Sequence, residues 1–331
     1  MKNPATLKKI SDHLSVSIST VSRALKDHQD VSPETKRRVK ELAEMLDYEP
    51  NSFAINLRKK HSDLFAVVVP EISSYFYHSF IEAVEEEARA IGYSIMILQS
   101  MNDPEVERNN LKLCRYNHVA GVFLAVSSSS LNADAFRKME DWDIPMVFFD
   151  KVPEEGTFNK VCLADYQLGR LAAEKMLETG KQKILAILGD NQLSITQRRE
   201  KGFRDYLQES KANVELEVVY AKNESEAEQR AADYFGTSQP ATAVFSMSDE
   251  ILCGVVRSFN RFNLKMPADA SLLTVSNGFL PRLFQPEIAY LETNGKKLGK
   301  LSFNRMKEIM DGKKFVRENF LECHFHPGGS L

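Results

Sequence analysis

The sequence predicts an α/β protein in which a helix-turn-helix head precedes two doubly wound parallel-sheet units. Residues 6–46 carry three short helical patterns, and from residue 64 onward short apolar runs alternate with longer amphipathic stretches in two successive series. Continuous apolar strands separated by helices indicate parallel sheets covered on both faces. A chain of 331 residues is too long for one ordinary domain and long enough to bury such cores.

The head begins with residues 6–25, TLKKISDHLSVSISTVSRAL. Its apolar positions fit two short helices, and Ser17 is a suitable N-cap for the second, which then starts at Ile18. This helix turns Val21 and Leu25 inward. The residues left outward are Ile18, Ser19, Ser22 and Arg23. Hydroxyl side chains and an arginine suit the DNA major groove, where arginine is the usual bidentate partner of guanine.

A third helix is predicted from its start signal, Ser32-Pro33-Glu34, which offers an N-cap, a proline at the first helical position and an acid near the positive end of the dipole. One face is apolar and the other basic. The apolar residues are Val39, Leu42, Ala43 and Leu46, and the basic ones are Lys36, Arg37, Arg38 and Lys40. A small bundle with a solvated basic face is the alternative, but a capped helix-turn-helix before a large α/β remainder favours a DNA-binding head.

Three segments carry a resemblance to a known family: TLKKISDHLSVSISTVSRAL, VSPETKRRV and YEPNSFAINLRKK. Together they resemble the lactose-repressor/galactose-repressor (LacI/GalR) family of bacterial transcription regulators, and the resemblance continues along nearly the whole chain. It departs at Ser15 and Ser11, where the family usually has glycine and alanine. It implies a periplasmic-binding-protein-like core and a homodimer that binds a pseudo-palindromic double-stranded DNA operator. The DNA contacts it implies are Thr6, Lys8, Ser17, Ile18, Ser19, Thr20, Ser22, Arg23, Asn51, Ala54, Leu57 and Arg58.

The charge distribution and the cysteines indicate which partners and which cellular compartment to expect. The net charge of −3 is unevenly distributed. Residues 1–60 contain 12 Lys and Arg and 8 Asp and Glu, whereas residues 61–331 contain 31 Lys and Arg and 38 Asp and Glu. DNA phosphates are therefore expected to bind at the basic N-terminal end. Four cysteines without pair spacing indicate neither a zinc site nor a disulfide framework, and fit a reducing cytoplasm. No signal peptide or membrane-spanning run is recognisable. We therefore expect a cytoplasmic protein with no membrane partner.

Residues 49–61, EPNSFAINLRKKH, form the predicted linker. Asn51 can cap two helical turns, which are too short to be stable alone. The resemblance implies that the two linkers of a dimer fold against each other on DNA and push Leu57 between the central base pairs of the minor groove. A leucine in a polar, basic segment is consistent with such a wedge, and packing on the core is the alternative.

Two doubly wound units in tandem place a cleft between the carboxyl ends of their strands. The strands are predicted at 64–70, 93–99, 120–126 and 145–150, then at 183–188, 214–220, 241–246 and 271–276, with helices such as 78–91 and 104–116. By resemblance, the chain crosses between the subdomains three times and forms a hinge. The expected divisions are a head at 1–48, a linker at 49–61 and an effector-binding and dimerisation domain at 62–331, with an N-subdomain at about 62–162 and 292–320 and a C-subdomain at about 163–291 and 321–331.

The candidate effector-binding residues follow the predicted strand ends or match family positions. They are Tyr75, Phe76, Gln99, Ser127, Asp150, Arg199, Ser248, Asp249, Ser276 and Asn277. The two aromatic rings could stack on a sugar or begin a core-packed helix. Asp150 could accept hydroxyl protons or cap a turn. Arg199 matches the family's effector-contacting arginine, and an arginine fork grips hydroxyls, carboxylate or phosphate. A surface salt bridge is its alternative, for which Arg198 is the better candidate.

Ser276 and Asn277 stand where the family usually has two aspartates, and Thr274 where it has glycine. Ser248 stands where an asparagine or similar residue is usual. Carboxylates reject anions, so neutral replacements remove that rejection. The expected effector is a sugar or a sugar derivative, which includes sugar phosphates and uronic acids.

Catalytic motifs are not recognisable: the sequence has no G-x-S-x-G elbow, phosphate loop or H-E-x-x-H helix. His324 and His326 share one face of a predicted strand, but no third metal ligand is evident. We therefore expect no catalytic residue, metal or cofactor, and a ligand-responsive repressor of transcription. The alternative is a solute-binding protein or carbohydrate-processing enzyme with a vestigial DNA-binding head.

Overall fold

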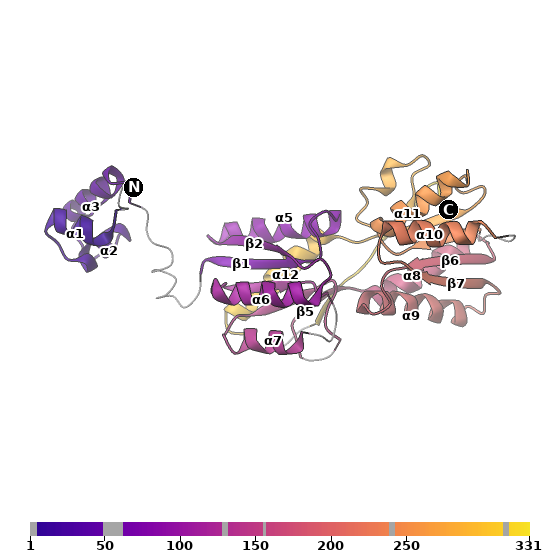
Figure 1. The fold of residues 1–331 in the computed structure, drawn as a ribbon, viewed down its shortest axis with the longest axis horizontal. Helices are drawn as coiled ribbons and strands as arrows, with labels where there is room; N and C mark the ends of the chain where they lie inside the picture. The colour runs from indigo at the N-terminus through magenta and orange to yellow at the C-terminus, as the bar shows by residue number, and fades with distance from the viewer. Residues whose placement is uncertain (1–4, 49–61, 128–131, 155–156, 238–241, 314–317) are drawn as a thin grey trace. The chain divides into compact units, whose positions relative to one another are not determined.

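The protein divides into two compact units, Met1–His61 and Ser62–Leu331 (Figure 1). The computed structural model describes residues 5–48, 62–127, 132–154, 157–237, 242–313 and 318–331. Each unit has its own hydrophobic core, which confirms the predicted combination of a helical head and a larger α/β part.

The first unit contains the three predicted helices. They are α1 (Leu7–Leu14), α2 (Ile18–Leu25) and α3 (Pro33–Met45). Each begins at a hydroxyl N-cap, because the side chains of Thr6, Ser17 and Ser32 accept hydrogen bonds from backbone N–H groups three residues later. Their inner faces form a small core of Ile10, Val21, Ala24, Val39 and Ala43, which Val31 joins from the loop before α3. The helix-turn-helix prediction is therefore confirmed.

Ser15 ends α1 in the left-handed conformation, with φ 52° and ψ 40°. Its N–H donates to the carbonyl of Ser11, which closes the turn. The left-handed region of φ and ψ is sterically unfavourable for a residue with a Cβ, but not for glycine. The turn thus keeps the shape that suits glycine although serine occupies it.

In the described residues, the second unit contains two six-stranded sheets. The first sheet is parallel, in the order β11-β5-β4-β3-β1-β2. Its strands are β1 (Leu64–Val69), β2 (Ser94–Gln99), β3 (Gly121–Leu124), β4 (Met146–Phe149), β5 (Lys160–Leu163) and β11 (Glu318–Leu321). One face packs against α5 (Tyr75–Ala90) and α12 (Gly295–Met310), and the other against α6 (Pro104–Tyr116) and α7 (Ala133–Glu140).

The second sheet has the order β12-β10-β9-β8-β6-β7 and is parallel except for β12. Its strands are β6 (Lys183–Leu188), β7 (Glu215–Tyr220), β8 (Ala243–Ser246), β9 (Ser271–Ser276), β10 (Ala289–Glu292) and β12 (Phe325–His326). One face packs against α8 (Asp165–Glu178) and α9 (Ser194–Glu209), and the other against α10 (Glu224–Phe235) and α11 (Asp249–Arg261). A 3-10 turn, η1 (Pro281–Leu283), precedes β10.

The chain passes between the two sheets three times. Strands β1 to β5 belong to the first sheet and β6 to β10 to the second, after which β11 returns to the first and β12 to the second. Helix α12 packs along α5, and Gly299 allows close approach there, since an added Cβ would lie 2.8 Å from the carbonyl oxygen of Phe80. Both sheets are apolar on both faces, which confirms the doubly wound fold class.

Candidate DNA-binding surface and ligand cavity

Helix α2 presents a polar outer face with one apolar residue on it. Ile18 is 47% exposed, whereas Val21 and Ala24 are buried against the head core. The hydroxyl of Ser17 caps the helix and also lies 2.7 Å from that of Ser19. Of the predicted DNA-contacting residues, Thr6, Lys8, Ser17, Ile18, Ser19 and Arg23 are exposed, and Thr20 and Ser22 are half-buried. This surface has the size and chemistry of a recognition helix.

Arg23 lies near an acid on the exposed side of the head. Its Nη1 is 3.7 Å from Oδ2 of Asp30, and its Nε donates to the carbonyl of Ser19 over 3.4 Å. Both members of the ion pair are exposed, so the pair is weak and a DNA phosphate or base can compete for the guanidinium.

The basic face predicted for α3 is partly neutralised within the head. Lys36 and Lys40 both reach Asp27, and Lys40 Nζ lies 2.7 Å from its Oδ2. Arg37 lies between Glu34 and Glu41 at 3.0 Å from each. The Arg37 pairs follow from helical spacing, whereas Asp27 reaches α3 from the loop before it. Both sets of pairs leave the face of α3 less positive than its composition suggests. The predicted contacts Asn51, Ala54, Leu57 and Arg58 lie outside the described residues.

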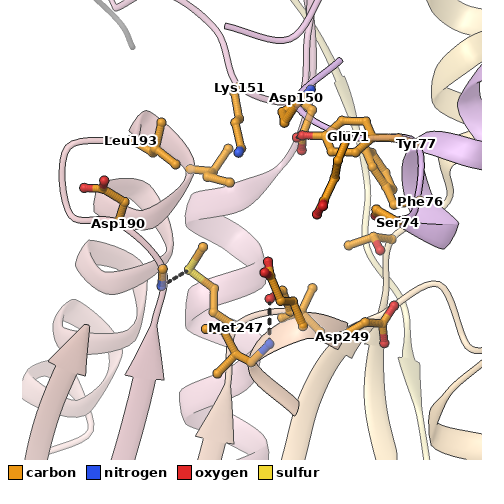
Figure 2. A pocket seen from close by; sticks show the side chains of 18 of the residues that line it. Glu71, Ser74, Phe76, Tyr77, Asp150, Lys151, Asp190, Leu193, Met247 and Asp249 are labelled. Atoms are coloured by element: carbon orange, nitrogen blue, oxygen red, sulfur yellow. Dashed lines mark hydrogen bonds between the residues drawn. The ribbon is translucent and has the colours of Figure 1, made fainter. Parts of the chain in front are cut away.

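A cavity of about 590 Å³ lies at the carboxyl ends of the strands of both sheets (Figure 2). Its lining includes Pro70, Asp150, Gly189, Ala221 and Met247, each of which directly follows the last residue of a strand. In open parallel sheets, ligands bind in the crevice outside the carboxyl ends of the strands. In Figure 2, Glu71, Asp150 and Lys151 come from the first sheet's loops. Asp190 and Met247 come from the second sheet's loops, and Asp249 begins α11.

Asp150 is held by a buried tyrosine. The hydroxyl of Tyr77 donates to its Oδ2 over 2.7 Å, and the backbone of Asp150 takes a left-handed φ of 55° directly after β4. Burial raises the pKa of Tyr77 well above its ordinary value, and the charge of Asp150 adds to the effect. Tyr77 therefore stays a neutral donor, and the second oxygen of Asp150 remains for other partners.

Arg199 and Asp165 form a buried ion pair at the wall of the cavity. Nε of Arg199 donates to Oδ1 of Asp165 over 2.8 Å, and its Nη1 donates to the carbonyl of Met247 over 3.0 Å. Gly169 on α8 lies so close to the backbone of Arg199 that a Cβ there would overlap the Arg199 carbonyl oxygen. Burial raises the pKa of Asp165 to about 6, while the charge of Arg199 opposes the rise.

Ser248 and Asp249 begin α11 and line the cavity. The Ser248 hydroxyl accepts from the N–H of Ile251, so this predicted ligand residue is also the helix cap. Ser276 and Asn277 do not belong to the cavity lining. Their side-chain oxygens accept from backbone N–H groups two residues later, at 3.0 and 3.1 Å, and shape the loop after β9.

The other candidate effector-binding residues also divide into those that line the cavity and those that do not. Tyr75 and Phe76 line the cavity, and the ring of Tyr75 lies 4.2 Å from that of Phe279. Ser127 also lines it, but its N–H and hydroxyl both donate to Oε2 of Glu107. Gln99 is outside the lining, and its side-chain oxygen accepts from the N–H of Ile72. The structure therefore groups Tyr75, Phe76, Ser127, Asp150, Arg199, Ser248 and Asp249 around one space.

Comparison with known proteins identifies both units. Residues 65–278 match the periplasmic binding protein domain, and residues 6–51 match the bacterial regulatory proteins of the lacI family. The chain belongs to the LacI family. As a LacI-family protein with an intact helix-turn-helix, it is a transcriptional regulator.

Curated relatives cover nearly the whole of this LacI-family chain. The ribose operon repressor of Halalkalibacterium halodurans is 27% identical over 90% of this chain and 88% of the relative. The repressor PurR of Actinobacillus pleuropneumoniae is 25% identical over 98% of this chain and 96% of the relative. A solved lac repressor dimer bound to operator and an anti-inducer has a TM-score of 0.87 at 20% identity, with 99% of each chain covered, and shares the fold.

Sequence reasoning missed several charged residues of the cavity: Glu71, Lys151, Asp190, Lys222 and Glu250. Lys151 directly follows the predicted strand at 145–150, and Asp190 stands two residues after the strand at 183–188. The rule that ligand-binding candidates stand just past a strand end, which selected Ser127, would have found both. Glu250 carries no such signal, because its neighbour Asp249 already explains the acid at the start of the helix.

Nothing in the described part of this LacI-family protein holds a metal or crosses a membrane. No group of three or more His, Cys, Asp or Glu there is placed to bind a metal ion. His326 instead stacks on Tyr290, with ring centroids 4.6 Å apart, and its Nε2 lies 3.6 Å from Oε2 of Glu292. No described helix is long and apolar enough to span a membrane.

Proposed function

We propose that this LacI-family protein is a repressor that binds a pseudo-palindromic operator as a homodimer and responds to a small-molecule effector, a sugar or sugar derivative. The observation that carries the proposal is the presence in one chain of a fully capped recognition helix and a cavity of about 590 Å³ at the ligand-binding edge of two sheets. The relatives support it, since they are named as repressors, and one LacI-family regulator of known structure contains ribose.

We infer the following division of labour along the chain. Residues 1–48 bind DNA, 49–61 form a linker with a hinge helix, and 62–331 bind the effector and dimerise. The N-subdomain is about 62–162 with 292–320, and the C-subdomain is about 163–291 with 321–331. The distribution of strands between the two sheets supports these boundaries. Three chain crossings between the sheets make a hinge, so closing the cavity would alter the spacing of the two heads in a dimer.

The effector contacts that we propose are the seven sequence-derived residues that line the cavity: Tyr75, Phe76, Ser127, Asp150, Arg199, Ser248 and Asp249. The other three candidates lie outside the lining and accept hydrogen bonds from loop backbone N–H groups: Gln99, Ser276 and Asn277. The DNA contacts that we propose are the eight head residues named above, together with Asn51, Ala54, Leu57 and Arg58 of the linker. We infer no enzymatic activity, because the curated relatives are named as transcriptional repressors or regulators.

DNA binding is tested by selecting bound sequences from a random double-stranded pool and measuring affinity for the enriched operator. Replacing Arg23 by Ala should lower operator affinity by about 5- to 150-fold, the range expected for one bidentate base contact of about 1 to 3 kcal/mol. Arg137→Ala is the matched control, since Arg137 is an exposed arginine on α7 in the second unit. Failure to enrich a two-fold symmetric site would overturn the proposed function.

A further inference from the structure

We propose that the effector carries a protonated amine, which Glu71 and Glu250 hold from the two halves of the cavity, and that the cavity excludes phosphates and carboxylates. This inference rests on the proposed function in one respect, because it takes the cavity as the effector site. It names a chemical class of effector that the relatives do not specify.

The charges of the lining are unequal. Six carboxylates and three cations line the cavity: Glu71, Asp150, Asp190, Glu224, Asp249 and Glu250, against Lys151, Arg199 and Lys222. Two of the cations already have carboxylate partners. Arg199 is paired with Asp165 at 2.8 Å, and Lys222 lies 3.3 Å from Asp190. Glu224 is matched by an arginine outside the lining, Arg257, at 2.5 Å.

Four carboxylates then share Lys151 as their one remaining cation in the lining. They are Glu71, Asp150, Asp249 and Glu250. Nζ of Lys151 donates to Oδ1 of Asn102 over 2.9 Å. Burial lowers the pKa of Lys151, and the charges of Asp150, Glu250 and Glu71 oppose this shift. One ammonium group cannot neutralise four carboxylates, so the cavity lining has an excess of negative charge.

Glu71 and Glu250 reach the cavity from different sheets. Glu71 lies in the loop after β1, and Glu250 lies in the first turn of α11. Burial raises the pKa of Glu250, and the negative charge of Glu71 raises it further. Two carboxylates that repel each other across a partly desolvated space gain most from a cation placed between them. An ammonium group supplies that charge together with three hydrogen-bond donors.

A second observation points to a missing donor in the same place. The Asp249 carboxylate accepts hydrogen bonds from the Ser276 side chain and the Asn277 backbone, but its buried Oδ1 has no hydrogen-bond partner among the described residues. A buried carboxylate oxygen without a donor is costly, and a ligand that brings N–H or O–H groups removes the cost. A phosphate brings neither the donors nor the charge that this lining needs.

The charges also revise an expectation drawn from the sequence. Neutral residues at 276 and 277 suggested that the cavity accepts anions, but neither residue lines it. The carboxylates that do line it come from other positions. The cavity is therefore acidic although the two aspartates are absent.

Cys253 lines the cavity and provides a direct probe of this charge. We would treat the full-length protein with two methanethiosulfonate reagents of similar size, one bearing trimethylammonium and one bearing sulfonate. In each reaction the thiolate attacks the reagent's sulfenyl sulfur, forms a mixed disulfide and releases methanesulfinate. Peptide-resolved mass spectrometry separates Cys253 from Cys323, and Cys114 and Cys162 are buried.

We expect the cationic reagent to modify Cys253 at least tenfold faster than the anionic one, relative to the ratio at a Ser210→Cys variant on the exposed end of α9. Replacing Glu71 and Glu250 together by Gln should lower the ratio severalfold. Glu215→Gln should leave it unchanged, because Glu215 begins β7 at the end of the sheet away from the cavity. Added salt should also lower the ratio, since salt screens exposed charges.

A ratio near one, or a faster anionic reagent, would overturn the inference. If Cys253 reacts with neither reagent, the same comparison at a Ser73→Cys variant decides the question, because Ser73 is exposed, lines the cavity and hydrogen-bonds to Glu71. The ratio does not depend on operator binding. A neutral or positive cavity in a protein that still binds its operator would refute only the effector class, whereas loss of sequence-specific DNA binding would refute the proposed function.

Discussion

Arg199 and Asp165 are each other's partner before any ligand enters the cavity. The Nε to Oδ1 distance is 2.8 Å, and the two side chains are 5% and 2% exposed. The guanidinium therefore holds α8 to α9 as well as facing the cavity, and its Nη1 bond to the carbonyl of Met247 ties both helices to the end of β8. A residue chosen from the sequence as an effector clamp thus also stabilises the second half of the unit.

Replacing Arg199 by Gln should lower the free energy of unfolding by about 3 to 5 kcal/mol, because it leaves a buried carboxylate without its partner. Urea denaturation followed by circular dichroism measures this loss. Arg198→Gln is the matched control, since Arg198 is one-third exposed and lies 3.7 Å from Glu318. Its removal should cost less than about 1 kcal/mol. Equal losses in the two variants would show that the buried pair contributes no more than a surface pair.

The pH dependence of stability should carry the signature of Asp165. Its pKa is about 6 in the folded protein against 3.8 for an ordinary aspartate, so between these values the folded state binds more protons than the unfolded state. The free energy of unfolding contributed by this group therefore falls as pH rises from about 4 to 6 and is constant above that range.

Asp165→Asn removes this contribution while other titrating groups remain in both proteins. The difference in unfolding free energy between wild type and variant, measured by urea denaturation at several pH values, should shift against the wild type as pH rises through that window. A difference that does not vary with pH, or that shifts toward the wild type, would contradict the raised pKa.

Substitutions of the two serines at the turn of the head should change its stability in opposite directions. Ser15→Gly should stabilise the head by roughly 0.5 to 1 kcal/mol, because glycine tolerates the left-handed backbone. Ser17→Ala should destabilise it by about 1 kcal/mol, because the N–H of Thr20 loses its cap. Hydrogen exchange of the α1 and α2 amides in the full-length protein measures both. Slower exchange in both variants, or faster exchange in both, would contradict the assigned roles.

Leu57→Ala tests the linker wedge. It should weaken binding to the selected operator, because an intercalating leucine supports the bent DNA that allows further contacts. Affinity for unrelated duplex DNA should change little, since phosphate contacts provide it. Titrations of both DNAs at the same salt concentration compare the two effects. An equal loss on operator and unrelated DNA would mean that Leu57 supports folding and not the opening of a base step.

Short-range patterns predicted much of the fold. The three head helices begin at the predicted hydroxyl caps, and all eight strands predicted for the two doubly wound units are present, because each depends on residues close in sequence. Strands β5, β10 and β11 were not predicted, whereas β12 falls within the strand predicted around His324 and His326. The three unpredicted strands contain four residues each, and they become strands by pairing with neighbours that are distant in the chain.

The sequence by itself determined the fold class, the recognition helix and the polar residues that follow the strands, because these depend on helical and strand periodicity and on capping. Tertiary structure decided which polar residues share the cavity and which partners they have. Asp150 meets Tyr77 across 73 residues, Arg199 meets Asp165 across 34, and Glu71 and Glu250 line one space from different sheets. Charge balance in a cavity is a property of the neighbours that folding brings together, so the acidity of this one could be recognised only once both sheets were in place.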